Sequence, residues 1–493
     1  MSDLKHRNYI LLYINGHRIK VQNEHAFMPL ADFLRYVREE TGTKIVCAEG
    51  DCGACTVLSA TLRRGDSSAQ KLNYLSFNSC IMPVFLLDCC SVVTVEGLTP
   101  EDSRTTGELD PIQESFVDCN ASQCGFCTPG FIMAAAGLYE RKEYPTARDV
   151  QNYLTGNLCR CTGYDSIIEA GISVATSQRV LLQERYFDTQ ANQELIEHLD
   201  IPVKMEISEL RYNAPCTLAA AVEIQNAFQP KLIAGATDLG VQINKGYLKT
   251  QTFLDLRLIE EMYLLEETSD AVLVGAKITW ETLRSFTKTS LPEFSDFLNI
   301  FASPQIKNVG TLVGNVANGS PIGDSLPYLM MAEATVHLAG IEGRRIVPMT
   351  EFYKGYKVLD MQDGELITHI SIPKAQASTH IKLYKISARR DLDIACVGMA
   401  CSMQLDGNRI SELSVAFGGV GPVVKRLTVV EEFLKGKEVN SQNIKAAVAL
   451  IRAEIAPISD VRGSKTFRIT AAKNLLRKFF FETKKTALLA QDA

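Results

Sequence analysis

Four cysteines near the N-terminus have the spacing of ligands for a redox cluster. A Cys-x4-Cys-x2-Cys run followed by a distant fourth Cys is the plant-type ferredoxin spacing for a [2Fe–2S] cluster. The predicted ligands are Cys47, Cys52, Cys55 and Cys80. Because four thiolates must converge, the run has to fold as a loop, and Gly50 and Gly53 permit the positive-φ turns that aim backbone N–H groups at the sulfurs. A four-Cys zinc site and incidental buried thiols are the alternatives.

A second group of cysteines lies further along the chain. It consists of Cys124, Cys127, Cys159 and Cys161. Pro129, just after Cys127, predicts a helix start, and the apolar run after Asp165 predicts another. Two helix N-termini facing one site favour an anionic iron–sulfur centre, because their N–H groups and dipoles stabilise negative charge. A zinc site stays open, as does a ligand set with Cys119, because Cys119, Cys124 and Cys127 repeat the ferredoxin run.

The residues around both groups resemble the two iron–sulfur modules of the molybdenum hydroxylases, the xanthine dehydrogenase and aldehyde oxidase family. The matching segments are Cys47–Val57, Gln123–Gly130 and Gly156–Tyr164. The resemblance implies two [2Fe–2S] clusters on this chain. It also implies that the ferredoxin-like cluster lies nearer a flavin and that the other cluster lies nearer molybdenum.

Length, composition and charge are those of a multidomain globular protein. At 493 residues, with 46% hydrophobic and 22% charged residues, the chain can bury the cores of several domains. Its formal net charge of −6 argues against nucleic acid or an anionic membrane as the main partner. We find no run of about 18 apolar residues and no signal-peptide pattern, so we expect no membrane segment and a cytoplasmic location. The 14 cysteines then indicate metal ligands rather than disulfides.

The pattern of residues 1–95 predicts a ferredoxin-like β-grasp [2Fe–2S] domain. Alternating apolar residues flank the hairpin turn Asn15-Gly16, and apolar residues recur at helical spacing over 30–37. The apolar residues of 81–84 are expected to form a strand that returns Cys80 to the cysteine loop.

The next two segments differ in their periodicity. Residues 96–177 have apolar residues at helical spacing, which predicts a helical-bundle [2Fe–2S] domain. Residues 178–205 are rich in Gln and Glu with little apolar pattern, which predicts a linker.

Two glycine-containing loops further on have the features of a dinucleotide site. Lys231–Gly240 is predicted as a strand, a turn and a helix start, an arrangement that offers backbone N–H groups to a pyrophosphate. Alone this pattern is more often structural, because it lacks both the dinucleotide fingerprint and the P-loop. A second stretch, Asn308–Asn315, leads into Ser320–Asp324. Two such loops in one domain favour a large dinucleotide more than either loop does alone.

These segments resemble the flavin domain of the same family, which is of the vanillyl-alcohol oxidase type. The resemblance implies an FAD-binding α+β domain at residues 206–380 and a C-terminal α+β flavoprotein domain at 381–493. Ala236 and Thr311 replace other small or polar residues common in the family, and Ile367 replaces a leucine; such changes leave backbone contacts intact. Carried over residue by residue, the flavin contacts fall on Leu232, Ile233, Ala234, Gly235, Ala236, Thr237, Asp238, Leu239, Phe301, Thr311, Leu312, Val313, Gly314, Asn315, Asp324, Ile367 and Lys385.

A charged segment lies between apolar runs at Lys385–Ala395. A run of charges is commonly a solvated loop, whereas in the family the matching loop covers one face of the flavin, where NAD access and flavin potential are controlled. The charged residues are Arg389, Arg390, Asp391 and Asp393. We see no acid–base triad, and we expect His337 and His369 to be ordinary strand residues. After strands alternating with helices to about Arg477, residues 483–493 are expected to form a tail.

The resemblance spans nearly the whole chain but includes no molybdopterin domain. It implies the electron-transfer small subunit of a split hydroxylase, most similar to bacterial xanthine dehydrogenase, with a molybdenum-cofactor-binding large subunit as its partner in an (αβ)2 heterotetramer. Electrons from hypoxanthine or xanthine would pass through both clusters to FAD and then NAD+, since iron–sulfur centres carry single electrons and flavin releases them as a pair. The alternatives are a related hydroxylase of an aldehyde or N-heterocycle with another acceptor, a free-standing electron carrier and a zinc-bearing adaptor.

Overall fold

The chain folds into two compact units. The computed structural model describes residues 6–99, 107–248, 251–389 and 392–491, except for the side chains of residue 178 and of residues 484–491. The first unit comprises Met1–Glu260 with Ala302–Gly310, and the second comprises Glu261–Phe301 with Thr311–Ala493. Each unit is described by itself.

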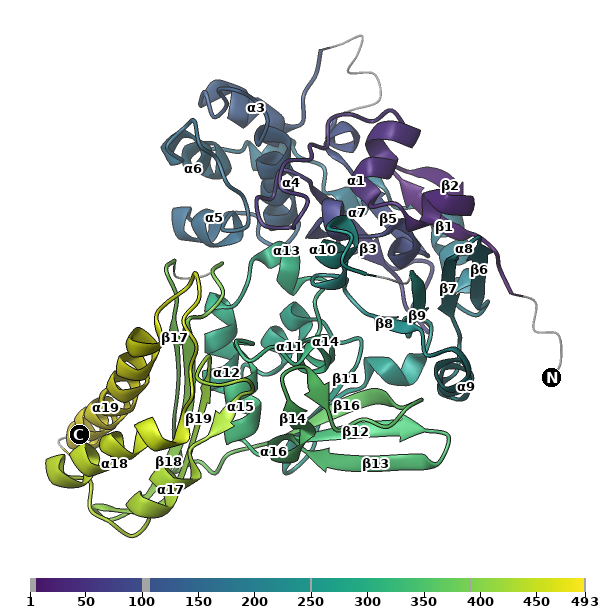
Figure 1. Ribbon diagram of the computed structural model, residues 1–493. Helices are drawn as coiled ribbons and strands as arrows, with labels where there is room; N and C mark the ends of the chain where they lie inside the picture. Colours follow the sequence, from purple (N-terminus) through teal and green to yellow (C-terminus); the bar gives the residue numbers. More distant parts are fainter. Residues whose placement is uncertain (1–5, 100–106, 249–250, 390–391, 492–493) are drawn as a thin grey trace. The chain divides into compact units, whose positions relative to one another are not determined.

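The first unit begins with a five-stranded sheet in the order β2-β1-β5-β3-β4 (Figure 1). The strands are β1 Ile10–Ile14, β2 His17–Val21, β3 Thr56–Thr61, β4 Leu75–Asn78 and β5 Cys90–Val93. Asn15 and Gly16 have φ angles of 50° and 80° and join β1 to β2 as an antiparallel hairpin. Residues 30–37 are helical, with α1 Leu30–Asp32 continuing as the π-helical turn Phe33–Val37. The predicted ferredoxin-like fold, hairpin and helix are confirmed.

The strand predicted after Cys80 is wrong. The strand β4 lies before Cys80, and Cys80 itself belongs to the 3-10 helix Ser79–Ile81. Pro83 follows and begins a second 3-10 helix, Val84–Leu87. Proline has no backbone N–H to donate to a sheet, so this apolar stretch is buried as tight turns instead of a strand.

The helical part of the first unit packs four helices around an apolar core. They are α3 Pro111–Asp118, α4 Thr128–Tyr139, α5 Ala147–Tyr153 and α6 Asp165–Ile172. Figure 1 shows α3 and α5 on either side of α6, and both contact it. The helix α4 is buried from Gly130 to Tyr139, and full burial of Phe131 alone contributes about 1.5–3 kcal/mol. The predicted helical domain is confirmed as a fold.

The segment predicted as a linker contains helices. Thr176–Gln178 is a 3-10 helix, and α7 Leu182–Arg185 and α8 Thr189–His198 follow. Leu182 and Leu195 are buried in two different hydrophobic clusters of this unit. One buried leucine in each of these short helices anchors it to the core of the first unit. A single apolar residue per helix does not give a helical periodicity that the sequence analysis could detect.

A second sheet of the first unit follows these helices. Its order is β6-β7-β9-β8, and its strands are β6 Val203–Ile207, β7 Leu210–Ala214, β8 Lys231–Ile233 and β9 Thr252–Asp255. The helix α9 Leu218–Phe228 connects β7 to β8, and α10 Leu239–Asn244 follows β8. Phe85 packs against Tyr212 and Phe253 at ring distances of 4.5 and 5.4 Å, so the two sheets of this unit share one core.

The second unit contains an antiparallel sheet in the order β10-β11-β16-β12-β13. Its strands are β10 Leu265–Glu267, β11 Ala271–Gly275, β12 Thr335–Gly340, β13 Gly343–Pro348 and β16 Leu366–Pro373. Short helices connect them: α11 Trp280–Phe286, α12 Pro292–Phe297, α14 Leu312–Asn318, α15 Leu326–Met331 and α16 Met349–Phe352. The hairpin β14 Tyr353–Gly355 with β15 Val358–Leu359 lies apart from the sheet, and α13 Pro304–Lys307 belongs to the first unit.

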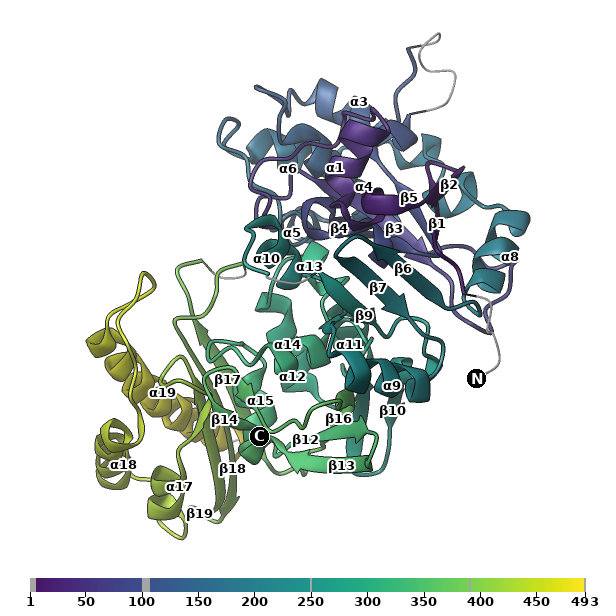
Figure 2. The same cartoon turned by 45° about the vertical axis from the view of Figure 1, so that its right-hand side comes forward.

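A four-stranded antiparallel sheet and three helices complete the second unit. Figure 2 shows the three long strands side by side with the helices on one face. The strands are β17 His380–Ile386, β18 Val397–Asp406, β19 Arg409–Gly418 and β20 Lys425–Arg426. The helices are α17 Thr428–Leu434, α18 Ser441–Glu454 and α19 Lys465–Gln491. All four strands precede the three helices. The sequence analysis predicted that strands and helices would alternate here, and that prediction is wrong.

The predicted C-terminal tail is helical. The helix α19 runs without a break to Gln491, through residues 483–491. Lys, Ala and Leu dominate this stretch and are strong helix formers, and it contains no Gly or Pro. Among the described helices, none combines the length and apolar character needed to cross a membrane.

Candidate iron–sulfur and flavin sites

Three cysteines of the first group, Cys47, Cys52 and Cys55, lie on a tightly packed loop between the π-helical turn and β3, and Cys80 lies in the 3-10 helix Ser79–Ile81. Gly50 and Gly53 have φ angles of 72° and 68°. A β-carbon at Gly50 would lie 2.5 Å from Ile81 Cδ1, and one at Gly53 would lie 2.3 Å from the carbonyl oxygen of Gly156. Both positions therefore require glycine for conformation and for space.

The four thiols of this group form a chain of contacts. Cys47 contacts Cys52 and Cys80, and Cys80 contacts Cys55. Hydrogen bonds from Cys52 and Cys80 lower the pKa of Cys47, and those to Cys47 raise the pKa of Cys52 and of Cys80. Contact with Cys80 lowers the pKa of Cys55 despite its burial.

Backbone amides also point at these sulfurs. Glu49 N lies 3.4 Å from Cys47 Sγ, and the amides of Asp51 and Ala54 donate to Cys47 and Cys52. Asn78 holds the loop by donating to the carbonyl oxygen of Gly50 at 2.7 Å. Thiolates that accept N–H bonds are the donor set of a [2Fe–2S] cluster, so these residues fit that cofactor.

The second cysteine group lies next in sequence to two helix starts, both at the predicted positions. Cys127 is the N-cap residue of α4, and α6 begins at Asp165, four residues beyond Cys161. Cys161 Sγ lies 3.6 Å from Cys124 Sγ, and Cys127 contacts Cys159. The four sulfurs therefore form two pairs, which also fits a centre with two irons.

Hydroxyl groups support the Cys159 side of this group. Thr162 Oγ1 donates to Cys159 Sγ at 3.2 Å, and the Cys159 amide donates to Tyr164 Oη at 3.0 Å. Burial raises the pKa of Cys159, but hydrogen bonds from Thr162, Cys161 and Cys127 together more than offset it and the net pKa is lowered. Burial, then contact with Cys159, raises the pKa of Cys127 to about 12.

Cys119 lies outside this pairing. It ends α3, where its amide donates to the carbonyl oxygen of Ser115, and its side chain packs on the helical core. Across the described ranges, no three His, Cys, Asp or Glu side chains are grouped as ligands of one metal ion. The choice of Cys159 and Cys161 over Cys119 remains a prediction.

The residues predicted to bind flavin are divided between the two units. Leu232–Leu239 lies in the first unit as the end of β8, a turn and the start of α10, which is the predicted strand, turn and helix. A β-carbon at Gly235 would lie 1.9 Å from the carbonyl oxygen of Val309, and Ala236 has a φ of 55°. The turn is thus held in direct backbone contact with the start of the second glycine-containing stretch.

The remaining predicted flavin residues lie in the second unit. Thr311 caps α14, accepting a hydrogen bond from the Gly314 amide at 3.0 Å. Phe301 packs against Trp280 at a ring distance of 4.7 Å. Leu312, Val313 and Asn315 lie in α14, and Ile367 is buried in β16.

Asp324 and Lys385 form a buried ion pair. Their side chains are 8% and 2% exposed, and Lys385 Nζ lies 2.8 Å from Asp324 Oδ2 and 3.3 Å from the carbonyl oxygen of Ile300. Burial raises the pKa of Asp324 more than Lys385 lowers it. Asp324 Oδ1 is buried and has no hydrogen-bond partner among the described residues. An unpaired buried acceptor fits a ligand with N–H or O–H donors, as FAD has.

The charged segment after β17 is described only in part. Arg389 pairs with Asp393, with Nη2 and Oδ1 2.5 Å apart, and the Arg389 amide donates to the same carboxylate. Arg390 and Asp391 lie outside the described residues. His337 and His369 lie in strands, as predicted. They occupy paired positions of β12 and β16, with their rings stacked 3.9 Å apart.

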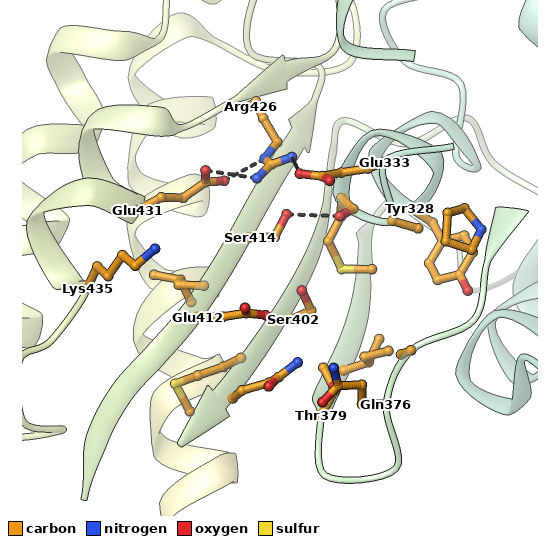
Figure 3. Close-up of a pocket in the computed structure, with 18 of the residues that line it drawn as sticks. Tyr328, Glu333, Gln376, Thr379, Ser402, Glu412, Ser414, Arg426, Glu431 and Lys435 are labelled. Carbon is orange, nitrogen blue, oxygen red and sulfur yellow. Dashed lines mark hydrogen bonds and ion pairs between the residues drawn. The ribbon is translucent and has the colours of Figure 1, made fainter. Parts of the chain in front are cut away.

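A separate hollow of about 550 Å³ lies in the second unit beside β18 and β19, and Glu431 and Glu432 of α17 also line it. Figure 3 shows Arg426 at its edge between Glu431 and Glu333, with nitrogen–oxygen distances of 2.7 and 3.0 Å. Ser402 and Ser414 line its floor. None of the predicted flavin residues lines it, so it is not the predicted cofactor site.

Comparisons with protein families account for most of the chain. A profile of the [2Fe-2S] binding domain matches residues 94–171, and one of the FAD binding domain in molybdopterin dehydrogenase matches residues 207–375. A profile of the CO dehydrogenase flavoprotein C-terminal domain matches residues 382–483. Together the matched ranges are similar to an iron–sulfur and FAD-domain chain of the molybdenum hydroxylase type. The matched ranges include the second cysteine group and not the first.

Individual relatives agree with this assignment. Xanthine dehydrogenase 1 of Arabidopsis thaliana is 30% identical over 96% of this chain and 39% of its own length. Aldehyde oxidase 1 of Bos taurus is 27% identical over 96% of this chain and 39% of its own length. The carbon monoxide dehydrogenase structure from Hydrogenophaga pseudoflava matches 56% of this chain and 96% of its own, with a TM-score of 0.53 and 27% identity. The chain thus spans about two fifths of the curated relatives it matches.

Several residues around the cysteines were not predicted. Contacts to the cysteines or to their loop come from Asn78, Thr162 and Tyr164. Each is close in sequence to a predicted cysteine ligand, so polar residues flanking the cysteines could have been predicted to support them. Asn157 and Gln305 form a buried contact that links distant segments. Only the structure brings those two together.

Proposed function

We propose that this chain is the electron-transfer small subunit of a xanthine dehydrogenase. In this proposal a molybdenum-cofactor subunit oxidises hypoxanthine or xanthine, and this chain conducts the electrons to NAD+. When bound, two [2Fe–2S] clusters carry electrons singly and FAD releases them as a pair. The proposed partner, the (αβ)2 assembly and the cytoplasmic location follow the sequence expectations.

One observation carries the proposal. The similarity to xanthine dehydrogenase 1 of Arabidopsis thaliana extends over 96% of this chain, whereas the carbon monoxide dehydrogenase structure matches only 56%. A single chain with both cysteine groups and the flavin-binding domain is therefore more similar to the xanthine dehydrogenases than to that structure.

The residues of this chain have distinct parts in the proposal. The two cysteine groups hold the clusters, and the amides directed at Cys47 and Cys52 stabilise negative charge on the sulfurs. The backbone of the turn around Gly235 would hold the flavin pyrophosphate, and Asp324, paired with Lys385, would accept a hydrogen bond from the flavin. No residue of this chain is proposed to act on the purine.

The flavin part of the proposal is tested by Lys385→Met. Removing the ammonium leaves the Asp324 carboxylate buried without its ion-pair partner, which costs about 3–5 kcal/mol. We expect flavin absorbance per chain to fall sharply. Lys382→Met on the same strand is the matched control, because Lys382 is exposed. Equal flavin content in both variants contradicts the assigned site.

The acceptor is tested by an anaerobic titration of the purified protein with NADH. We expect NADH to bleach both the flavin and the iron–sulfur absorbance, because electrons can enter from the acceptor end of the relay. A protein with both chromophores that dithionite bleaches and NADH does not would contradict NAD as acceptor. A colourless, zinc-loaded protein would contradict the relay itself.

A second candidate is a related hydroxylase with a different substrate and acceptor. It is favoured by the match to aldehyde oxidase 1 of Bos taurus, which covers the same 96% of this chain. Isolation of the protein with its molybdenum subunit, followed by turnover with xanthine and with an aldehyde, separates the two. Copurification with several unrelated redox proteins in place of one stoichiometric subunit would favour a free-standing carrier.

A further inference from the structure

A buried network of polar side chains joins the two cysteine loops of the first unit. Asn157, two residues before Cys159, donates from Nδ2 to the carbonyl oxygen of Gly53 at 2.9 Å. Gly53 directly follows Cys52. Gln305 donates from Nε2 to Asn157 Oδ1 at 2.8 Å, and the two amide residues are 0% and 2% exposed. Each loop is therefore tied to the same pair of amides.

Gln305 reaches this network from a distant part of the chain. It lies on α13, in the segment Ala302–Gly310, which belongs to the first unit although the residues on both sides belong to the second. A second amide, that of Asn308 directly after the helix, donates to the carbonyl oxygen of Ser76 at 2.8 Å. The helix is thus anchored at two points, and only Gln305 touches the network between the cysteine loops.

The packing around the network leaves no room for the loops to slide. A β-carbon at Gly156 would lie 2.0 Å from Gln305 Oε1, and one at Gly53 would lie 2.3 Å from the Gly156 carbonyl oxygen. The Leu158 amide donates to the Cys52 carbonyl oxygen at 2.9 Å, in direct contact between the loops.

The network is not optimised for stability. Gln305 Oε1 is buried and has no hydrogen-bond partner in the described part of the chain. An unpaired buried acceptor is costly, and an apolar side chain of similar shape at this position would avoid the cost. A buried polar pair retained at such a cost is typical of groups that specify one arrangement.

We propose that Gln305 is a positioning residue that, through Asn157, fixes the separation of the two iron–sulfur clusters. The inference rests on the proposed function, because it requires both clusters. The amides carry no charge, so they fix the geometry of the loops without altering the charge near either cluster. Their removal changes the spacing of the clusters and leaves all eight cysteines in place.

The test compares wild-type protein with Gln305→Met, which keeps the length of the side chain and removes its donor. Both proteins are reduced with dithionite and examined by electron paramagnetic resonance at low temperature, where two nearby reduced clusters split each other's signals. We expect Gln305→Met to retain wild-type iron content and to lose or reduce the splitting. Asn157→Leu removes the other half of the pair, and we expect the same loss.

Asn308→Ala is the matched control, because it breaks a buried amide contact at the C-terminal end of the same helix, outside the network. It should lower the melting temperature and leave the splitting unchanged. Wild-type splitting in both Gln305→Met and Asn157→Leu would overturn the inference, as would equal loss in Asn308→Ala. If either Gln305→Met or Asn157→Leu does not fold, the splitting measured in the other variant tests the inference. Wild-type protein without cluster signals would contradict the proposed function and this inference with it.

Discussion

The two cysteine groups hold their sulfurs in different environments. In the first group Cys55 and Cys80 are 2% and 3% exposed, and the loop glycines are in contact with neighbouring segments. In the second group Cys124 and Cys161 are exposed. Both groups lie in one unit and belong to the same predicted relay, so the difference reflects the local fold and not the type of ligand.

This difference suits different tasks. A buried cluster depends on backbone N–H groups to stabilise its charge, and the amides directed at Cys47 and Cys52 supply them. An exposed cluster can be approached by another protein surface. On the proposed function, the second group accepts electrons from the partner and the first passes them on within this chain.

The largest expected effect comes from removing one ligand of each group. Cys80→Ser and Cys161→Ser should each reduce bound iron by about half, because each removes one ligand of one [2Fe–2S] cluster. The variants should lose different paramagnetic signals. Iron analysis with paramagnetic resonance of both proteins checks this, and loss of the same signal in both would show that the groups do not bind separate clusters.

Substituting one glycine in each cysteine loop compares how tightly the two loops are packed. Gly53 and Gly163 both have positive φ, but a β-carbon at Gly163 would have no atom of the described residues within 4 Å. Gly163→Ala should cost only the left-handed backbone strain, about 1–2 kcal/mol, whereas Gly53→Ala adds about 1–3 kcal/mol of steric overlap. Denaturant unfolding of both variants gives the comparison. Equal losses would mean that the first loop is not more constrained than the second.

Thiol reactivity tests the same contrast without mutation. In protein freed of iron, iodoacetamide should label Cys124 and Cys161 about tenfold or more faster than Cys55 and Cys80, because reaction requires access to the sulfur. Mass spectrometry of peptides taken over time measures the order. Faster labelling of the buried pair would show that the first loop opens readily.

The smallest expected effect is on the pH dependence of folding stability. Measuring it in iron-free protein separates acid unfolding from the loss of the clusters in acid. Burial, with His337 and Arg344 nearby, lowers the pKa of His369 from 6.5 to about 4. The unfolded chain therefore binds more protons between these pH values, and stability falls as pH drops from 6.5 towards 4. His369→Phe should flatten this part of the profile in iron-free protein. An unchanged slope in thermal melts across this range would assign the acid sensitivity to other groups.

Much of the local structure near the cysteines was predictable from sequence. The Asn15-Gly16 hairpin and the helix starting after Cys127 depend on neighbouring residues, and both are present. The prediction of a strand after Cys80 was wrong, because the effect of Pro83 outweighs the apolar pattern of this segment. The prediction of a tail at residues 483–491 was wrong, because their helix propensity and their continuity with the rest of α19 outweigh their polarity.

The connections between sites were not predictable in the same way. Gln305 and Asn157 are 148 residues apart in sequence, and no local spacing relates them. The orphaned Asp324 Oδ1 likewise becomes visible only when its surroundings are folded. Ligand types can be inferred from spacing, whereas the contacts that place one site against another require the three-dimensional fold.

The central claim is that this chain holds two distinct iron–sulfur clusters and one flavin. A redox titration of the purified protein, followed by paramagnetic resonance and by flavin absorbance, tests it most directly. We predict two separate [2Fe–2S] signals with different midpoint potentials, together with one flavin per chain. A single iron–sulfur signal, or zinc in place of iron, would contradict the account.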